Sequence, residues 1–94
     1  MAKLTSAQIR GAMKGVPGWK RKGAILTRVY RFKDFVAAMK FVSKVARLAE
    51  KAWHHPDIDI RWNEVVLALT THDEGGLTGK DFALAKQFDK LARH

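Results

Sequence analysis

Apolar side chains recur every three or four residues through the middle of the chain, from residue 34 to about residue 53. Lysines and arginines occupy the opposite side, and neither Gly nor Pro interrupts the pattern. The apolar positions are Phe35, Met39, Val42, Val45, Ala46, Ala49 and Trp53. This spacing predicts one long amphipathic helix. Because a proline disfavours helical geometry at the residue before it, Pro56 predicts that the helix ends near the adjacent histidines His54 and His55.

Two-residue alternation of apolar and polar side chains flanks this helix and predicts strands. Residues 19–32 indicate two strands with a bend near Gly23, and residues 57–62 and 65–72 indicate two more with a short turn between them. In the last strand the bulkier apolar residues share one side. We therefore expect His72, on the other side, to lie on the more open face of the sheet.

Capping-box sequences predict two shorter helices towards the ends of the chain. Thr5 and Gln8 mark the start of a helix over about residues 6–14, and Thr78 and Asp81 mark the start of the last helix. The predicted order is helix, two strands, helix, two strands, helix. Hairpins joined by helices are typical of the α+β class, with an antiparallel sheet covered by helices on one face.

Length and composition narrow the range of functions. We expect the 94 residues to form a single domain, residues 1–94, with an active site that is shallow or shared between subunits. The absence of cysteine excludes disulfides, thiolate nucleophiles and cysteine zinc sites. No stretch approaches the roughly 20 apolar residues of a membrane span, and there is no apolar signal core. We therefore expect a soluble cytoplasmic protein.

The net charge of +9 is unevenly distributed along the chain. Residues 1–53 hold 13 Lys/Arg against two acidic residues, whereas residues 54–94 hold 5 against 7. Such polarity is compatible with nucleic acid or another acidic partner. The cations are scattered, however, and only residues 20–22 form a cluster, which favours a solvated surface. Aromatics are not interleaved with cations outside the apolar pattern, so nucleic-acid binding is not favoured.

Three histidines, His54, His55 and His72, fall at the ends of predicted elements. A helix end and a strand end can meet at one rim of a sheet, where functional sites tend to lie. A structural role is the alternative, because a histidine near a helix C-terminus can bond free carbonyls and interact with the helix dipole. A zinc site is less favoured: neighbouring residues in extended chain point to opposite sides, which separates His54 from His55, and no HExxH spacing is present.

Other catalytic patterns are poorly matched. The last glycine-rich loop is not a phosphate-binding loop, because only three residues separate Gly75 from Gly79 and Asp81 stands where Ser or Thr is needed. No hydroxyl lies in a recognisable nucleophile elbow. Acid–base chemistry without a metal or cofactor remains, since imidazole titrates at about pH 6.5 and can both take and give protons.

Seven residues with fixed spacing lie between positions 50 and 81. They are Glu50, three residues, His54-His55-Pro56, five residues, Trp62, nine residues, His72, eight residues and Asp81. Further matches are "GW" at 18–19, "FKDF" at 32–35 and "THDEGGLT" from Thr71. On these residues the chain, from about Leu4 to Leu91, resembles the pterin-4a-carbinolamine dehydratase family.

This resemblance implies an enzyme that removes water from 4a-hydroxytetrahydrobiopterin and gives the quinonoid dihydropterin. The tetrahydropterin used by aromatic amino acid hydroxylases is thereby recycled. The resemblance also implies a four-stranded antiparallel sheet with three helices on one face, in the order α-β-β-α-β-β-α, assembled into homodimers or homotetramers. Neither a metal nor a cofactor is implied, because the reaction requires only a proton delivered to the C4a hydroxyl and one removed from N5.

The resemblance also assigns roles to the histidines. His54 and His72 would be the exchangeable acid and base, and His55 would hold the pterin and its hydroxyl. Because Glu50 lies one helical turn before His54, we expect it to orient that imidazole.

Three more residues are expected around the substrate. Trp19 and Pro56 would shape a pocket for the flat ring. Asp81 would be either a partner of the histidines or only the cap of the last helix.

A different class of function is the main alternative. Some mammalian members of the family also act as dimerisation cofactors for a homeodomain transcription factor, through a helix surface and not through the histidines. The long basic helix could serve a protein partner in the same way.

Overall fold

The computed structural model describes residues 2–93, which form three α-helices, four strands and one short 3₁₀ helix. In chain order these are α1 (Ser6–Met13), β1 (Lys20–Lys22), β2 (Ile25–Arg31), α2 (Phe35–Ala52), β3 (Asp57–Arg61), β4 (Glu64–Leu69), the 3₁₀ helix η1 (His72–Glu74) and α3 (Gly79–Ala92). The predicted order is confirmed, with η1 added between β4 and α3. Within residues 2–93, no helix is both long and apolar enough to cross a membrane.

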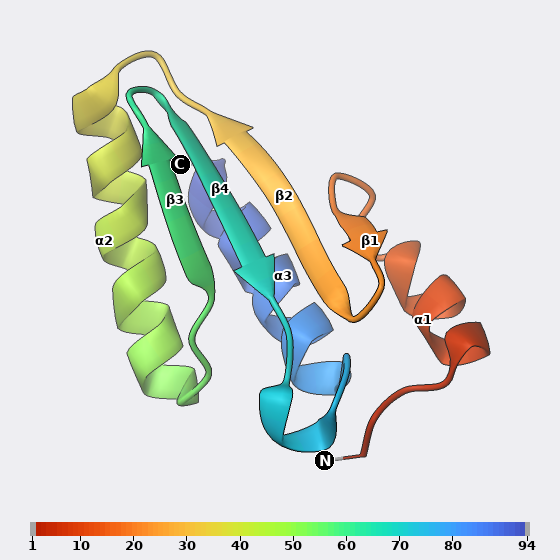
Figure 1. The fold of residues 1–94 in the computed structure, drawn as a ribbon. Helices are drawn as coiled ribbons and strands as arrows, with labels where there is room; N and C mark the ends of the chain where they lie inside the picture. Colours follow the sequence, from red (N-terminus) through yellow and green to blue (C-terminus); the bar gives the residue numbers. More distant parts are fainter. Residues whose placement is uncertain (1, 94) are drawn as a thin grey trace.

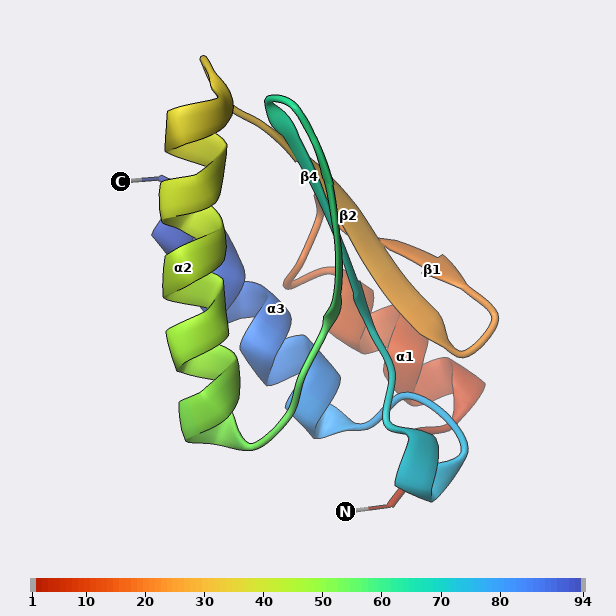
Figure 2. The same cartoon turned by 60° about the vertical axis from the view of Figure 1, so that its left-hand side comes forward.

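The four strands form one antiparallel sheet in the order β1-β2-β4-β3. Leu26 pairs with Leu69 and Tyr30 with Val65, and all four side chains are buried on the same face. The three helices lie on this face, whereas no helix of the described chain covers the other (Figures 1 and 2). The predicted α+β architecture is therefore confirmed.

The core lies between the sheet and the helices. Its largest contributions include Val65 and Leu67 from β4, Phe41 and Val45 from α2, and Phe82, Leu84 and Phe88 from α3. Three of the apolar positions predicted for the long helix, Phe35, Ala46 and Trp53, are exposed instead. Phe35 and Trp53 lie at the two ends of α2, where the helix begins and where the chain leaves it.

β4 ends earlier than the sequence predicts, at Leu69. Thr71 and Gly76 then form an isolated antiparallel bridge, and Gly75 takes a positive φ of 73°, so the chain folds back on itself. His72 consequently begins η1 and does not belong to a strand. The prediction that His72 lies on the open face of the sheet is wrong for this reason.

α2 ends in a Schellman motif immediately before the histidines. Trp53 adopts the left-handed conformation (φ 54°, ψ 40°), and its N–H donates to the carbonyl of Glu50 at 3.3 Å. The N–H of His54 donates to the carbonyl of Ala49 at 3.1 Å. The helix thus ends where predicted, but the reversal takes place at Trp53, and Pro56 lies beyond it on the way into β3.

A buried carboxylate ties the sheet to the C-terminal half of α3. Asp89 Oδ1 accepts hydrogen bonds from Trp19 Nε1 at 3.0 Å, from Arg28 Nη1 at 2.9 Å and from the Tyr30 hydroxyl. Burial, together with the neighbouring carboxylate, raises the pKa of Tyr30 above its usual range. The phenol therefore keeps its proton and remains a donor in this cluster.

Candidate active site

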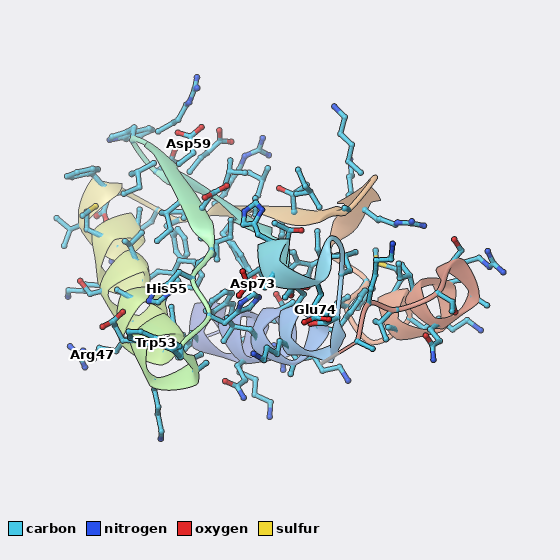
Figure 3. All side chains as sticks on the ribbon, turned by 60° about the horizontal axis from the view of Figure 1, so that its bottom comes forward. Arg47, Trp53, His55, Asp59, Asp73 and Glu74 are labelled. Carbon is cyan, nitrogen blue, oxygen red and sulfur yellow. The ribbon has the colours of Figure 1, made fainter. Side chains whose placement is uncertain are left out.

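The histidines gather at one end of the molecule, where four chain segments meet. The C-terminal end of α2, the start of β3, the η1 loop and the N-terminal end of α3 all lie at the lower end of Figure 1. Figure 3 views this end and shows Trp53 beside His55 at the end of α2, on the same side of the molecule as the η1 loop with Asp73 and Glu74. A helix end and a strand end thus meet at one rim of the sheet.

His54 pairs with a carboxylate on α3. Its Nε2 lies 2.6 Å from Asp81 Oδ1, and the side chains are 13% and 0% exposed. The second oxygen, Asp81 Oδ2, accepts from the N–H of Thr78 at 2.9 Å and from the hydroxyl of Thr71 at 2.8 Å. Asp81 therefore belongs to the capping box of α3 and is also the partner of His54, so the alternative that it is only a cap is wrong.

Two threonines complete this network and are not among the site residues predicted from the sequence. Thr71 Oγ1 lies 3.0 Å from Thr78 Oγ1, and both side chains are buried. Because the Thr71 proton goes to Asp81, the Thr78 hydroxyl must donate to Thr71. The capping box of Thr78 and Asp81 is visible in the sequence. Thr71 carries no such signal, because its position depends on the bridge to Gly76.

Glu50 pairs with His55 and not with His54. His55 Nε2 lies 2.5 Å from Glu50 Oε2, and the side chains are 52% and 67% exposed. The prediction that Glu50 orients His54 is wrong, because the left-handed turn at Trp53 directs His54 towards α3 and returns His55 to the last turn of α2. The site therefore contains one buried and one exposed imidazole–carboxylate pair.

His72 lies at the same end of the molecule but belongs to neither pair. It is the first residue of η1 and is exposed. The preceding residue, Thr71, bonds the same carboxylate as His54. His72 is thus the chain neighbour of a residue that hydrogen-bonds the carboxylate of the buried pair.

Trp19 does not belong to this group of residues. It is 3% exposed and bonded to Asp89, which follows Asp81 by eight residues, or about 12 Å along α3. The expectation that Trp19 shapes the pocket is wrong, because its apolar ring is used in the core. Pro56 is half-buried and lies between His55 and β3 in the chain, so its part in a pocket stays a prediction. Trp62, a signature position, lies in the turn between β3 and β4 at the other end of the sheet (Figure 1).

A small cavity adjoins His54 between the end of α2 and α3. Its volume is about 130 Å³, and it is lined by Ala52, His54, Lys80, Ala83, Leu84 and Gln87. Ligand pockets usually measure roughly 300–1,000 Å³. The cavity can therefore enclose only part of a bicyclic ligand, and the rest must lie against the surface around it.

The hydrogen bonds define which nitrogen of each ring is left for a ligand. A carboxylate only accepts, so Nε2 of His54 carries a proton and Nδ1 holds the lone pair of the neutral ring. The same reasoning applies to His55 and Glu50. Nδ1 of His54 can thus take up a proton, and the buried carboxylate of Asp81 stabilises the imidazolium that results. Within residues 2–93, no three His, Asp or Glu side chains are arranged to hold a metal ion.

A four-stranded antiparallel sheet with helices on one face (Figure 2) and two imidazole–carboxylate pairs at one rim defines a small α+β domain. The model of one family, pterin 4 alpha carbinolamine dehydratase, matches residues 2–91. The chain belongs to the pterin-4a-carbinolamine dehydratase family, as the signature residues indicate.

Individual relatives agree with this assignment. A protein of Thermomicrobium roseum is 53% identical over 92 residues, which cover 98% of this chain and 99% of the relative. A protein of Acidobacterium capsulatum is 55% identical over 91 residues, which cover 97% and 99%. Both carry the name pterin-4-alpha-carbinolamine dehydratase as a provisional assignment.

Two solved structures share the fold. The crystal structure of a transcriptional coactivator/pterin dehydratase from Brucella melitensis is 34% identical, with a TM-score of 0.92 over 96% of this chain and 98% of that one. A pterin dehydratase-like protein identified as a RuBisCO assembly factor in the alpha-carboxysome is 24% identical, with a TM-score of 0.67 over 79% and 86%. The second similarity concerns the fold alone.

Proposed function

We propose that the protein is a dehydratase that converts 4a-hydroxytetrahydrobiopterin to quinonoid dihydrobiopterin and water. Membership of the family supports the substrate class. The observation that carries the proposal is the pair of His54 with the buried Asp81, which leaves Nδ1 of His54 for a substrate. The reaction breaks the C4a–O and N5–H bonds and forms a C4a=N5 double bond. It requires a base and an acid, and no electrons are exchanged with another molecule.

Each histidine has a separate task in this proposal. Nδ1 of His54 takes the proton from N5, and Asp81 stabilises the imidazolium. His72, on the neighbouring loop, delivers a proton to the departing C4a hydroxyl. His55, held by Glu50, binds that hydroxyl and fixes the ring relative to the two proton-transfer groups. Afterwards His54 and His72 return to their starting states by exchange with solvent.

A spectrophotometric assay on freshly generated carbinolamine tests these roles. We expect His54→Ala and His72→Ala to lower kcat by about 10²- to 10⁴-fold, the contribution of a positioned acid or base. His55→Ala should mainly raise KM. A His55→Ala variant that keeps both the wild-type kcat and the wild-type KM would show that its assignment is wrong. A wild-type protein that does not accelerate dehydration above the spontaneous rate would overturn the proposed function itself.

We further propose that identical chains associate through the free edge of β3. All five residues of this strand are exposed. Two copies paired antiparallel about Asp59 would place Asp57 of each copy opposite Arg61 of the other, and Ile58, which is 37% exposed, opposite Ile60. A homodimer formed in this way could pair again into a homotetramer. Light scattering that gives a monomer at micromolar concentration would overturn this assembly.

We place the reaction in tetrahydropterin recycling, downstream of an aromatic amino acid hydroxylase, because such hydroxylases form the 4a-hydroxytetrahydropterin that this reaction consumes. A coupled assay with a hydroxylase should show faster return of tetrahydropterin when the protein is added. If the protein leaves the rate of tetrahydropterin return unchanged at saturating hydroxylase, it does not act downstream of the hydroxylase.

A protein-binding role, as a dimerisation cofactor of a transcription factor, is the second candidate. It is favoured by the name of the Brucella neighbour, which joins the words coactivator and pterin dehydratase. The exposed basic residues Lys40, Lys44 and Arg47 of α2 offer a surface for it. The two roles are separable, because alanine at His54 should abolish dehydration and leave binding through α2 unchanged.

A further inference from the structure

Trp53 combines two features that are unfavourable in a folded domain. It adopts the left-handed conformation (φ 54°), which Gly or Asn usually occupies at a helix C-terminus, and its side chain is 77% exposed. The indole does not contribute to the hydrophobic core. A bulky residue kept in such a conformation without a packing reason points to a role in function.

Trp62 shares both features and therefore provides an internal comparison. Its φ is 52°, its side chain is 67% exposed, and it lies in the turn between β3 and β4. The surroundings of the two residues differ. The ring of Trp53 meets the ring of His55 edge-on, with centroids 5.6 Å apart and planes at 72°, whereas the turn with Trp62 lies at the opposite end of the sheet (Figure 1). The contact with His55 singles out Trp53.

The position of Trp53 relative to the cavity is the second observation. Its two chain neighbours, Ala52 and His54, both line the cavity of about 130 Å³. That volume is too small for a whole bicyclic ligand, so part of the ring must rest on the surface beside His54 and His55. An exposed indole at this place offers the flat apolar face on which such a ring can lie. Trp19, the aromatic that the sequence suggests for this task, is buried against Asp89.

We infer that Trp53 is a positioning residue that stacks on the ring of the pterin at the mouth of the site. This inference rests on the proposed dehydratase function and adds the residue that holds the ring face. The indole lies beside His55, the residue proposed to bind the C4a hydroxyl, so stacking would also fix the distance of that hydroxyl from the imidazole. Stacking on an aromatic face tolerates changes at the ring edge, so different reduced pterins should use Trp53 equally.

Three variants test the inference. Trp53→Gly removes the indole and suits the left-handed backbone, Trp53→Phe keeps an aromatic ring, and Trp62→Gly makes the same change at the matched position. We expect KM for the carbinolamine to rise about tenfold or more in Trp53→Gly and about threefold or less in Trp53→Phe, with kcat changed less than KM. Trp62→Gly should leave KM unchanged. The thermal midpoint of Trp53→Gly should equal or exceed that of the wild type, because glycine relieves the left-handed conformation.

Quenching of tryptophan fluorescence by 7,8-dihydrobiopterin provides a readout independent of turnover. The quench should be retained in Trp62→Gly and largely lost in both Trp53 variants. An unchanged KM in Trp53→Gly, or an equal rise in Trp62→Gly, would overturn the inference and leave the dehydratase function standing. If the wild type fails to dehydrate the carbinolamine but its quench by dihydrobiopterin still depends on Trp53, the proposed function fails and the contact with the pterin ring stands.

Discussion

Asp81→Asn separates the two tasks of Asp81, because asparagine keeps the shape of the side chain and removes its charge. The amide oxygen can replace Oδ2 as the acceptor for the Thr78 N–H and the Thr71 hydroxyl, which lie 2.9 and 2.8 Å away. The amide nitrogen then takes the place of Oδ1, 2.6 Å from His54 Nε2. Because an NH₂ group only donates, His54 must accept at Nε2 and carry its proton on Nδ1. The proposed base, Nδ1 of His54, is thereby turned into a donor.

The expected loss of activity is large and the expected loss of stability small. A positioned proton-transfer group contributes about 10²- to 10⁴-fold, so kcat should fall by that factor. The cap of α3 is kept, so the free energy of unfolding should change by about 1 kcal/mol or less. Asp81→Ala is the matched comparison: it removes the cap as well and leaves the buried Thr71 hydroxyl without its acceptor. For that variant we expect about 2–4 kcal/mol of lost stability in addition to the loss of turnover.

Three measurements check this reasoning. Turnover is followed spectrophotometrically after subtraction of the spontaneous dehydration rate, stability by urea denaturation, and the tautomer of His54 by nitrogen NMR of protein labelled at histidine. The reasoning would be refuted by an Asp81→Asn variant that retains wild-type kcat. It would equally be refuted by a His54 ring that keeps its proton on Nε2 in the variant.

Three further predictions concern other parts of the chain. In Gly18→Ala, the new Cβ would overlap the guanidinium of Arg28, which must move out of its ion pair with Asp89; urea denaturation should show a loss of about 1–3 kcal/mol with unchanged turnover. Glu50→Gln removes an exposed charge beside His55, so the thermal midpoint should stay the same while KM rises severalfold; an unchanged KM would contradict the role of this pair. Folding raises the pKa of Tyr30, the single tyrosine, so the unfolded state loses this proton first and stability should fall as pH rises above about 10. Tyrosinate absorbance should then appear only together with unfolding, and its appearance in the folded protein at about pH 10 would contradict the burial argument.

The arrangement of elements could be predicted because the signals for it are local. The alternation of Val65, Leu67 and Leu69 fixes which face of β4 is buried, and the helical period from residue 35 onwards fixes the existence and length of α2. The predicted inner side of α2 is only partly right, because the buried Ala38 and Phe41 are missing from it. Each signal requires only neighbouring residues of the chain. The signature residues allowed the family to be identified, because their spacing over residues 50–81 is specific and not merely periodic.

Side-chain partners could not be predicted in the same way, because they depend on a few backbone angles. Glu50 reaches His55 instead of His54 because the left-handed conformation at Trp53 reverses the chain. Glycine is the residue that usually takes this conformation at the end of a helix. Backbone propensity gives no reason to expect this conformation at a tryptophan. Trp19 was misplaced for a similar reason: its partner, Asp89, lies 70 residues away in the sequence and is brought to it only by the packing of α3 on the sheet.

α3 carries two buried carboxylates, and their partners explain why only one of them belongs to the candidate site. Asp89 accepts from an indole, a guanidinium and a phenol whose pKa is raised, and none of these groups exchanges its proton near neutral pH. Asp81 accepts from an imidazole, a group with a second ring nitrogen that can accept a proton, and this imidazole borders a cavity. Burial of a carboxylate therefore does not distinguish a structural from a catalytic role in this domain. The distinction that we propose is whether the hydrogen bonds lead to a group that can pass a proton to a ligand. On this ground the proposed chemistry lies at the N-terminal end of α3, and the structural anchor lies two turns further along the same helix.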